Sequence, residues 1–581
     1  MSTDTLARRH FVRVDGSGVH YLREGSGPPV VLLHPSWGPA DYMLPLMRRL
    51  APDHTVFALD APGCGGSDRH PKQRDVTVAD AADALARTLA ALQLPPCPVL
   101  GTHTGAAVAI ELALRHPSLV TALVCDCPPA FTPEEVPFFV CEYNLSPVTV
   151  SGDGGHLFAN WVKIRDRGVW FPFTDPIPEN RMWWPFHPPE LWHRETLFSM
   201  LAGDGAGDVY GAVFTWDGPT KVAALTHPAS FVGWEGDPIY DQLDRLPPPR
   251  PNQRLVRYPN PEAYLDGAVE LLRGYRIDSG TPEDPPFDPT PGAVNRRYVN
   301  GSSGQVLVRS AGEEQGGRAL LLLHDGRASS RVFEPLMGEL ATGRRVFAPD
   351  IPDNGASDPL TASEFPSIAD YADAVAEVAL TLGLEGPDLV AVGAGAAVAL
   401  ELRSRAPFAE SRCVLASPDF YAPEFTRRLA AEWVPPLAPR WDGSHLNQLW
   451  LMLRDEHTFW PWFDKSPSGA CAVALPTDWR EFHARVVDIL RSLPTYHRLT
   501  AAALDFDWAQ ALRRLGDAGV TLVTANDDPR RPHVSAAAEL AGLPSPGVLP
   551  ASVGEQAGEI LRILRTPERG DGRSASHAEP R

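Results

Sequence analysis

The sequence predicts an α/β protein made of two tandem copies of one fold, each a mostly parallel sheet with flanking helices and a helical, aromatic-rich cap insertion. Three observations predict this fold class. The chain repeats itself along its length, short apolar runs alternate with helical patterns in each copy, and a segment rich in Trp, Phe and Pro interrupts both copies at the same point. Such alternation indicates parallel strands joined by crossover helices.

The repeat is seen most directly in short segments that return with the same spacing. His34 follows the apolar run VVLL, and His324, 290 residues later, follows LLLL. With the same offset, DAPGCGGSD at 60–68 returns as DIPDNGASD at 350–358, and GAAVA at 105–109 returns at 395–399. Self-similarity at a fixed long period is the signature of repeated structural units, so the chain is predicted to be a duplication.

The elements of the first copy follow from its pattern. Strands are expected at 29–34, 55–59, 97–101, 120–125 and 229–234, and helices at 75–94 and 106–116. The cap insertions are expected at about 131–222 and 420–515.

The predicted domain boundaries follow from composition. Residues 276–297 are Pro-rich and acidic without periodicity, which is typical of a linker. The predicted domains are therefore residues 1–275 and 298–565, and the tail at 566–581 is predicted to be disordered.

Charge and cysteine usage narrow the function. The 581 residues carry 52 basic and 72 acidic side chains, a net charge of −20 that repels phosphate backbones and anionic lipid surfaces. We therefore expect a small-molecule substrate, with neither nucleic acid nor membrane as partner. The seven cysteines form no Cys-x-x-Cys pair, and an odd number without a disulfide framework favours a cytoplasmic location.

At four segments the sequence resembles the α/β-hydrolase family, and the resemblance extends to both halves. The segments are LLHPSWG, LDAPGCGGSD, VLGTHTGAAVAIELALRHP and FVGWEGDPIY, at 32–38, 59–68, 99–117 and 231–240. In that family a Gly-x-Ser-x-Gly elbow presents a nucleophilic Ser at a helix N-terminus, main-chain amides hold an oxyanion, and a late Asp orients a His. The resemblance implies this fold in each half and a hydrolase-like activity.

The chain departs from the family pattern where the nucleophile is expected. Residues 101–105 read Gly-Thr-His-Thr-Gly, so His103 takes the place of the Ser, and Gly393 takes it in the second copy. The late Asp is present as Asp237 and Asp528, but RLVRYPNPEAYLDG and PGVLPASVGEQAG, which follow the last strands, contain no His. A Ser-His-Asp esterase is therefore not expected in either half.

His103 has two interpretations. In the first it is a general base, or more rarely a nucleophile, oriented by Asp237, and the dyad activates water or removes a substrate proton. The N-terminus of the following helix is expected to lower its pKa and favour the neutral form. In the second, His103 is a remnant packed by its neighbours and Asp237 caps a turn before Pro238. Asp528 has no evident partner, and a structural role is expected for it.

Main-chain donors survive the loss of a catalytic side chain. The amides near Ser36 and Thr104 are therefore expected to form an oxyanion hole, and those near Gly326 and Ala394 are their equivalents in the second copy.

One motif appears in both cap insertions. Asp-Gly-x-His-Leu-(x)3-Trp-(x)3-Arg-Asp occurs at 153–166 and again at 442–455. In a helix, the spacing of this motif places its His, Trp and Arg on successive turns. These side chains could then form an aromatic roof over a substrate. The candidate substrate contacts are His156, Trp161 and Arg165, matched in the degenerate second site by His445 and Arg454. The alternative is a helix cap with ordinary packing inside the insertion.

No metal or cofactor is expected. The sequence has no metal-ligand spacing of the His-Glu-x-x-His kind and no Gly-x-Gly-x-x-Gly or Walker loop. The sequence therefore favours a cofactor-independent enzyme whose N-terminal half acts on a small, largely apolar substrate in a hydrolase-like reaction. Two alternatives stay open: a lyase or cyclase that uses the same base, and a catalytically inactive tandem pseudo-hydrolase that binds a ligand or acts as a scaffold. The two halves could also pack as an intramolecular pseudo-dimer.

Overall fold

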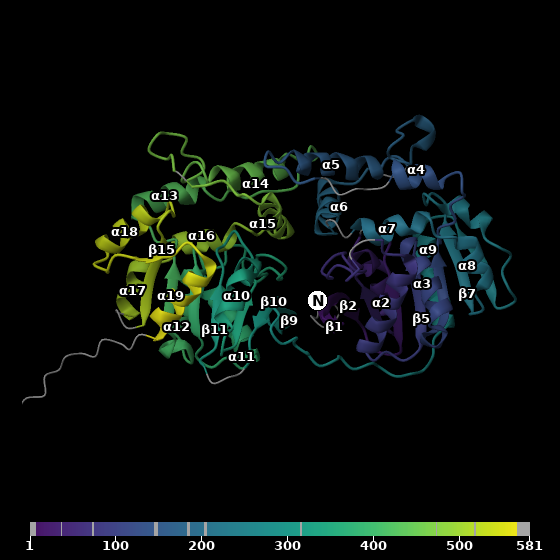
Figure 1. The fold of residues 1–581 in the computed structure, drawn as a ribbon, viewed down its shortest axis with the longest axis horizontal. Coiled ribbons are helices and arrows are strands. Elements are labelled where there is room, and N and C mark those ends of the chain that lie inside the picture. The colour runs from purple at the N-terminus through teal and green to yellow at the C-terminus, as the bar shows by residue number, and fades with distance from the viewer. Residues whose placement is uncertain are drawn as a thin grey trace, which may run out of the picture.

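The computed structural model describes residues 7–36, 38–72, 75–143, 149–182, 186–202, 206–313, 317–471, 473–515 and 519–565, without the side chains of residues 206 and 207. The tail at 566–581, predicted to be disordered, lies outside these residues. Figure 1 shows two α/β domains side by side, with a layer of helices above them that runs from one domain to the other. Among the described residues, no helix is both long and apolar enough to cross a bilayer.

The N-terminal domain is built on an eight-stranded sheet in the order β1-β2-β4-β3-β5-β6-β7-β8. Its strands are β1 (Arg8–Val14), β2 (Ser17–Glu24), β3 (Pro29–Leu33), β4 (Thr55–Leu59), β5 (Cys97–Thr102), β6 (Val120–Asp126), β7 (Ala229–Trp234) and β8 (Gln253–Tyr258). Strands β3 to β8 run parallel, and β1 and β2 form an antiparallel hairpin at one edge. The five predicted apolar runs are confirmed as the central strands. Strands β1 and β8 lack a continuous apolar run because they lie at the half-exposed edges of the sheet.

Helices cover both faces of this sheet. Helices α2 (Val78–Ala91) and α3 (Thr104–Arg115) pack on one face, and α1 (Leu44–Leu50) and α9 (Pro261–Gly274) pack on the other. Helix α2 begins at a capping box in which Thr77 and Asp80 satisfy each other's main-chain N–H groups. The two predicted helices are thereby confirmed as α2 and α3.

The C-terminal domain repeats this plan in the order β16-β15-β14-β13-β11-β12-β10-β9. Its strands are β9 (Asn295–Gly301), β10 (Gly304–Ala311), β11 (Leu320–Leu323), β12 (Val346–Pro349), β13 (Asp388–Val392), β14 (Cys413–Ala416), β15 (Val520–Ala525) and β16 (Gly547–Leu549). Its sheet-packing helices are α10 (Glu334–Leu340), α11 (Ile368–Thr381), α12 (Gly395–Arg403), α18 (Arg531–Leu540) and α19 (Val553–Arg565). Strand β9 begins inside the predicted linker, because its alternating residues pair with β10.

A helical cap leaves each sheet at the same point. The N-terminal cap lies between β6 and β7 and contains α4 (Val136–Cys141), α5 (Gly155–Arg167), α6 (Pro189–Ala202), α7 (Ala206–Phe214) and α8 (Gly218–Ala224). The C-terminal cap lies between β14 and β15 and contains α13 (Pro423–Glu432), α14 (Ser444–Asp455), α15 (Trp479–Arg491), α16 (Arg498–Asp505) and α17 (Trp508–Leu515).

Among the described residues, the two domains touch at two places. Below the caps, the edge strands β1 and β9 lie against each other, with the rings of Phe11 and Tyr298 stacked 5.7 Å apart. The Arg9 main-chain N–H donates to Gln305 Oε1 at 2.7 Å. Above, α5 and α14 meet at the top of the molecule (Figure 1), and residues of both caps share one hydrophobic cluster.

Candidate active site

The turn between β5 and α3 holds His103 in a backbone conformation that side-chain-bearing residues rarely adopt, with φ 50° and ψ −111°. Two glycines allow this turn. A Cβ on Gly101 would lie 2.2 Å from the Gly105 carbonyl oxygen, and one on Gly105 would lie 2.4 Å from the Leu33 carbonyl oxygen. The sequence therefore folds here into a sharp elbow that lifts the imidazole off the end of the sheet.

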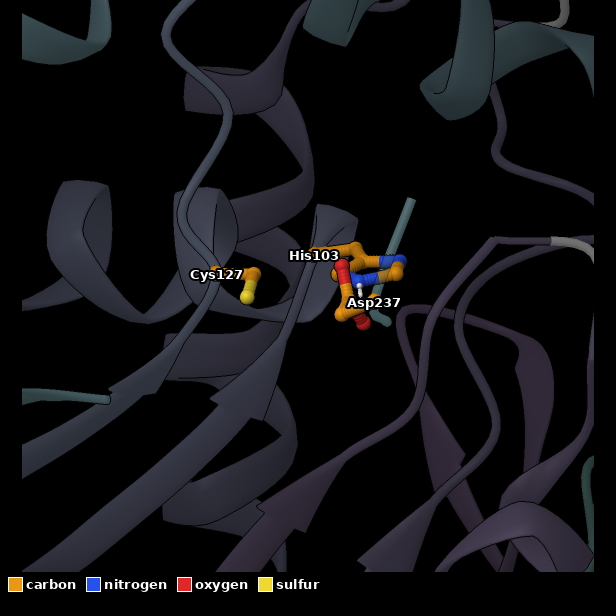
Figure 2. Close-up of side chains that lie close together, drawn as sticks. All are labelled: His103, Cys127 and Asp237. Carbon is orange, nitrogen blue, oxygen red and sulfur yellow. Dashed lines mark hydrogen bonds and ion pairs between the residues drawn. The ribbon is translucent and has the colours of Figure 1, made fainter. Parts of the chain in front are cut away.

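His103 and Asp237 are hydrogen-bonded partners. His103 Nε2 lies 2.9 Å from Asp237 Oδ2, although 134 residues separate them in the chain. Asp237 lies in the loop after β7, where its Oδ1 accepts from the Ile239 N–H at 3.0 Å, so the carboxylate is held from both sides. Figure 2 shows the second ring nitrogen of His103 directed away from Asp237. The dyad thus leaves Nδ1 as the atom that can take up a proton.

The expected lowering of the His103 pKa is wrong. Burial does lower the pKa, but the charge and hydrogen bond of Asp237, with a further contribution from Asp126, outweigh burial and raise it above its ordinary value. Two carboxylates beside the ring have a stronger effect than the partial charge of the α3 N-terminus.

Two further groups surround the dyad at the end of β6. Burial and the neighbouring Asp237 raise the pKa of Asp126 to about 7. Cys127 brings its sulfur close enough that donor atoms of His103, Cys127 and Asp237 all lie within 4.8 Å of one another (Figure 2). Burial and both carboxylates raise the pKa of the Cys127 thiol far above its usual range, so the sulfur is a neutral S–H group here.

The two residues predicted to contribute oxyanion amides lie together. Ser36 Oγ donates to Thr104 Oγ1 at 2.7 Å, which ties the loop after β3 to the start of α3. His34 supports the same loop, since its Nε2 accepts from the Ala61 N–H at 2.9 Å. Both Ser36 and Thr104 border the cavity that contains His103.

A cavity of about 380 Å³ lies between this elbow and the N-terminal cap. Its walls are largely aromatic, with Phe131, Phe171, Phe214, Tyr143, Tyr210 and Trp192 among them. Three charged residues from the cap also line it: Arg167 at the end of α5, and Arg194 and Glu195 on α6. Burial raises the pKa of Glu195 to about 8, although the Arg194 guanidinium lies 3.5 Å from Glu195 Oε1. Glu195 is therefore a neutral acid at pH 7.

The structure corrects the predicted substrate contacts. Among the described residues that line the cavity, Arg167 is present and Arg165 is not, because Arg165 packs 5.2 Å over the Phe186 ring. His156 and Trp161 also do not line the cavity. Both point toward the C-terminal cap, where Trp161 is fully buried.

The corresponding position of the C-terminal domain is filled by the protein itself. Asp325 Oδ1 accepts from the Gly326 N–H at 2.8 Å and the Ala394 N–H at 3.3 Å, the two amides predicted for the second oxyanion hole. A Cβ on Gly393, which has φ +55°, would lie 2.3 Å from the same oxygen. A carboxylate of the chain thus occupies the space of both the elbow side chain and the oxyanion.

Asp528 and His445 of the second site are engaged elsewhere. Asp528 has partners, contrary to expectation: it accepts from Ser417 Oγ and pairs with Arg530 at 3.1 Å, and Arg530 also lies 3.7 Å from Asp325. His445 contacts the N-terminal cap. Arg454 lies on α14, with its Nε buried and without a hydrogen-bond partner in the described part of the chain.

Sequence reasoning missed Asp126, Arg167 and Glu195. Asp126 ends a parallel strand, and the carboxyl ends of such strands border ligand sites, so this signal was available. Arg165 and Arg167 lie on one helix, and the spacing alone does not say which of them faces the cavity. Glu195 carries no motif.

Family models match both halves. A model described as alpha/beta hydrolase fold matches residues 28–143, and one described as alpha/beta hydrolase family matches residues 320–561.

Short segments of curated proteins also match. The uncharacterized hydrolase YraK of Bacillus subtilis is 31% identical over 113 residues, 19% of this chain and 42% of that protein. The cis-3-alkyl-4-alkyloxetan-2-one decarboxylase of Shewanella oneidensis is 34% identical over 127 residues, 21% of this chain and 39% of that protein. The chain thus spans less than half the length of these relatives.

Solved structures each match less than half of the chain. An esterase from Exiguobacterium antarcticum superposes with a TM-score of 0.36 at 17% identity, covering 45% of this chain and 98% of the esterase. A bacterial membrane phospholipase A gives a TM-score of 0.37 at 20% identity, covering 46% of this chain and 86% of that chain. With a family match and an eight-stranded, mostly parallel sheet in each half, the chain is a tandem duplication of the α/β-hydrolase fold.

Proposed function

We propose that the N-terminal domain is a cofactor-independent hydrolase in which His103 acts as a general base. The observation that carries the proposal is the 2.9 Å hydrogen bond between His103 Nε2 and Asp237 Oδ2 at the wall of a largely aromatic cavity. Asp237 fixes the tautomer with the proton on Nε2, so Nδ1 is the basic atom. The role of Asp237 is to hold the ring in place and stabilise the imidazolium that forms.

In the proposed reaction, water attacks the acyl carbon of a small ester, lactone or thioester. His103 Nδ1 takes a proton from the water, and the main-chain amides near Ser36 and Thr104 donate to the developing oxyanion. Glu195, as a neutral acid, protonates the leaving group when the carbon–heteroatom bond breaks. The proton held by His103 then returns through water to the Glu195 carboxylate, which restores both groups.

The cavity also suggests a substrate class. Its aromatic walls suit a largely apolar body, and the Arg167 guanidinium suits a carboxylate on the substrate. The same base could remove a proton from carbon next to such an acid group, so a lyase or cyclase step is the second candidate. The absence of a Ser or Cys at the elbow tip favours that alternative, because the tip offers no ordinary acyl-enzyme nucleophile.

The experiment is turnover of a panel of esters, lactones and thioesters, with and without a carboxylate, from about pH 5 to about pH 9. His103→Ala should lower kcat/KM by about a hundredfold or more, and Asp237→Asn by at least about tenfold. His116→Ala is the matched control, because His116 makes a 2.7 Å bond to Asp83 in the same domain, outside the cavity. Equal rates in all four proteins would remove the hydrolase assignment.

We also propose a cytoplasmic location. All seven cysteines are free thiols, which is the usual state in a reducing compartment.

A further inference from the structure

The repeated cap motif builds the contact between the two caps. His445 on α14 and His193 on α6 form one hydrogen bond across it, Nε2 to Nδ1, at 3.0 Å. His156 on α5 and His483 on α15 form the other, also Nε2 to Nδ1 at 3.0 Å. His156 and His445 are 289 residues apart, and His193 and His483 are 290 apart, so the two bonds are copies of one another. A surface that pairs with its own copy in this way is isologous, as in a two-fold dimer.

Main-chain groups fix the direction of these bonds. The Arg440 N–H donates to His445 Nδ1 at 3.1 Å, so the proton of that ring lies on Nε2 and is donated to His193. The His193 Nε2–H group in turn donates to the Leu490 carbonyl oxygen at 3.0 Å. The Ser151 N–H donates to His156 Nδ1 at 3.3 Å in the same manner. Each donor ring is therefore held neutral and in one tautomer.

Aromatic packing repeats with the same symmetry. The Trp161 ring stands edge-on to His445 at 5.2 Å, and Trp450 stands edge-on to His156 at 4.8 Å. A Cβ on Gly154 would lie 2.6 Å from Trp450, and one on Gly443 would lie 2.7 Å from Trp161. Each helix thus begins at a glycine because the Trp of the other cap lies against it.

The helices that make this contact also roof the cavity of the N-terminal domain. Ile164 and Trp192 line the cavity and belong to the cluster that both caps share. On α5, Trp161 faces the C-terminal cap and Arg167 the cavity; on α6, His193 faces the C-terminal cap and Glu195 the cavity. A shift of either helix at the contact would therefore move a charged group at the cavity wall.

The C-terminal domain offers no comparable site among its described residues, because Asp325 fills its elbow and oxyanion positions. We propose that the C-terminal domain is a non-catalytic clamp: through the two His–His hydrogen bonds, its cap holds the N-terminal cap over the cavity. His156, His193, His445 and His483 are positioning residues. The clamp does not require the cavity to be catalytic, so its failure and failure of the proposed hydrolase are distinguishable.

The test is hydrogen exchange of the full chain, read on peptides from α5 and α6 and on peptides from both sheets. His445→Leu removes the Nε2–H donor and should speed exchange in α6 by about tenfold while the sheets stay protected. His445→Gln keeps an N–H donor and should restore most of the protection. Once a substrate is known, His445→Leu should raise KM more than it changes kcat.

Unchanged exchange in His445→Leu would overturn the clamp, and so would equal exchange in the Leu and Gln variants. If the sheets of His445→Leu also lose protection, that variant is unfolding as a whole. The test then uses His483→Leu and His483→Gln, which probe the second His–His bond, between His156 and His483. There Gln supplies the carbonyl oxygen that accepts from His156 and Leu does not. His457→Leu is the matched control and should exchange like the parent protein, because the His457 side chain bonds to the Ala474 carbonyl within the C-terminal cap.

Discussion

His445 of the C-terminal cap donates from Nε2 to His193 Nδ1 of the N-terminal cap at 3.0 Å, and this bond exists only while His193 is neutral. Burial and the neighbouring His193 lower the pKa of His445 to about 3, and burial and His156 lower the pKa of His483 to about 4. Burial also lowers the pKa of His156 and His193. The cap contact is therefore built from four uncharged imidazoles.

Acid should weaken the cap contact. The pKa of a His in the unfolded chain is about 6.5, which is above the pKa values of these buried rings. Below that pH the unfolded chain therefore binds more protons than the folded chain. The contribution of the neutral imidazoles to the free energy of unfolding is fully present above about pH 6.5 and decreases as the pH drops toward about 4. For His445 alone, the free energy of unfolding decreases by about 2 kcal/mol at pH 5. The charged groups that face the four rings are Asp153, Arg331, Arg440 and Asp442.

Thermal unfolding measured from about pH 7.5 to about pH 4.5 checks this expectation. The double variant His445→Gln, His483→Gln should show a shallower loss of Tm on acidification, because neither amide titrates. A pH dependence identical to that of the parent protein would contradict it.

The proposed hydrolase should have a bell-shaped pH profile. His103 must be neutral to act as a base, and its raised pKa places the rising limb above about pH 6.5. Glu195 must be protonated to act as an acid, and its pKa of about 8 sets the falling limb. The measurement is kcat/KM against pH. Glu195→Gln should lower the rate and remove the falling limb, and a falling limb that survives in this variant would exclude Glu195 as the acid.

Arg167 should recognise an anionic group on the ligand. Arg167→Met should weaken the binding of carboxylate-bearing compounds by about tenfold to a hundredfold, since a hydrogen bond to a charged group is lost. Arg165→Met, two positions away on α5 but outside the cavity lining, is the control and should leave binding unchanged. Titration calorimetry measures the Kd of these compounds for both variants. An equal loss for uncharged analogues would point to a packing role.

Gly393 and Asp325 should be energetically coupled. Gly393→Ala should destabilise the C-terminal domain by about 2–4 kcal/mol, because its φ is positive and the new Cβ meets the Asp325 carboxylate. Adding Asp325→Ser to Gly393→Ala should recover the part of the lost stability that comes from the steric clash. The part that comes from the positive φ of residue 393 should remain. Urea unfolding of both single variants and the double variant measures the coupling, and strict additivity would mean that the two residues do not compete for space.

The sequence predicts the fold well because local rules dominate there. The apolar runs follow the alternation of strands along the chain, and Gly101 is required by the backbone of Gly105, four residues later. The pairing of His103 with Asp237 follows from the order of the strands, which brings both loops to one edge of the sheet.

The roof of the cavity could not be predicted in this way. Whether Arg165 or Arg167 faces the substrate depends on the rotation of α5, and Trp161 sets this rotation through a contact with His445, 284 residues further along the chain. Recurrence of the cap motif suggested a substrate-binding role, but a motif kept in both copies is also what an isologous contact requires. Asp325 shows no motif, because its function depends on two amides that only the folded elbow brings within its reach.

Joining two such domains in one chain has an evolutionary consequence. In a homodimer every substitution appears on both sides, so both cavities must change together. In a fused chain the linker keeps the partners at a high effective concentration, and each half can diverge alone. Arg167 and Glu195 of the N-terminal cap correspond to Glu456 and Arg485 of the C-terminal cap, with the charges exchanged. The four imidazoles have stayed identical while the polarity around the two elbows has been inverted, as expected when one gene encodes both partners.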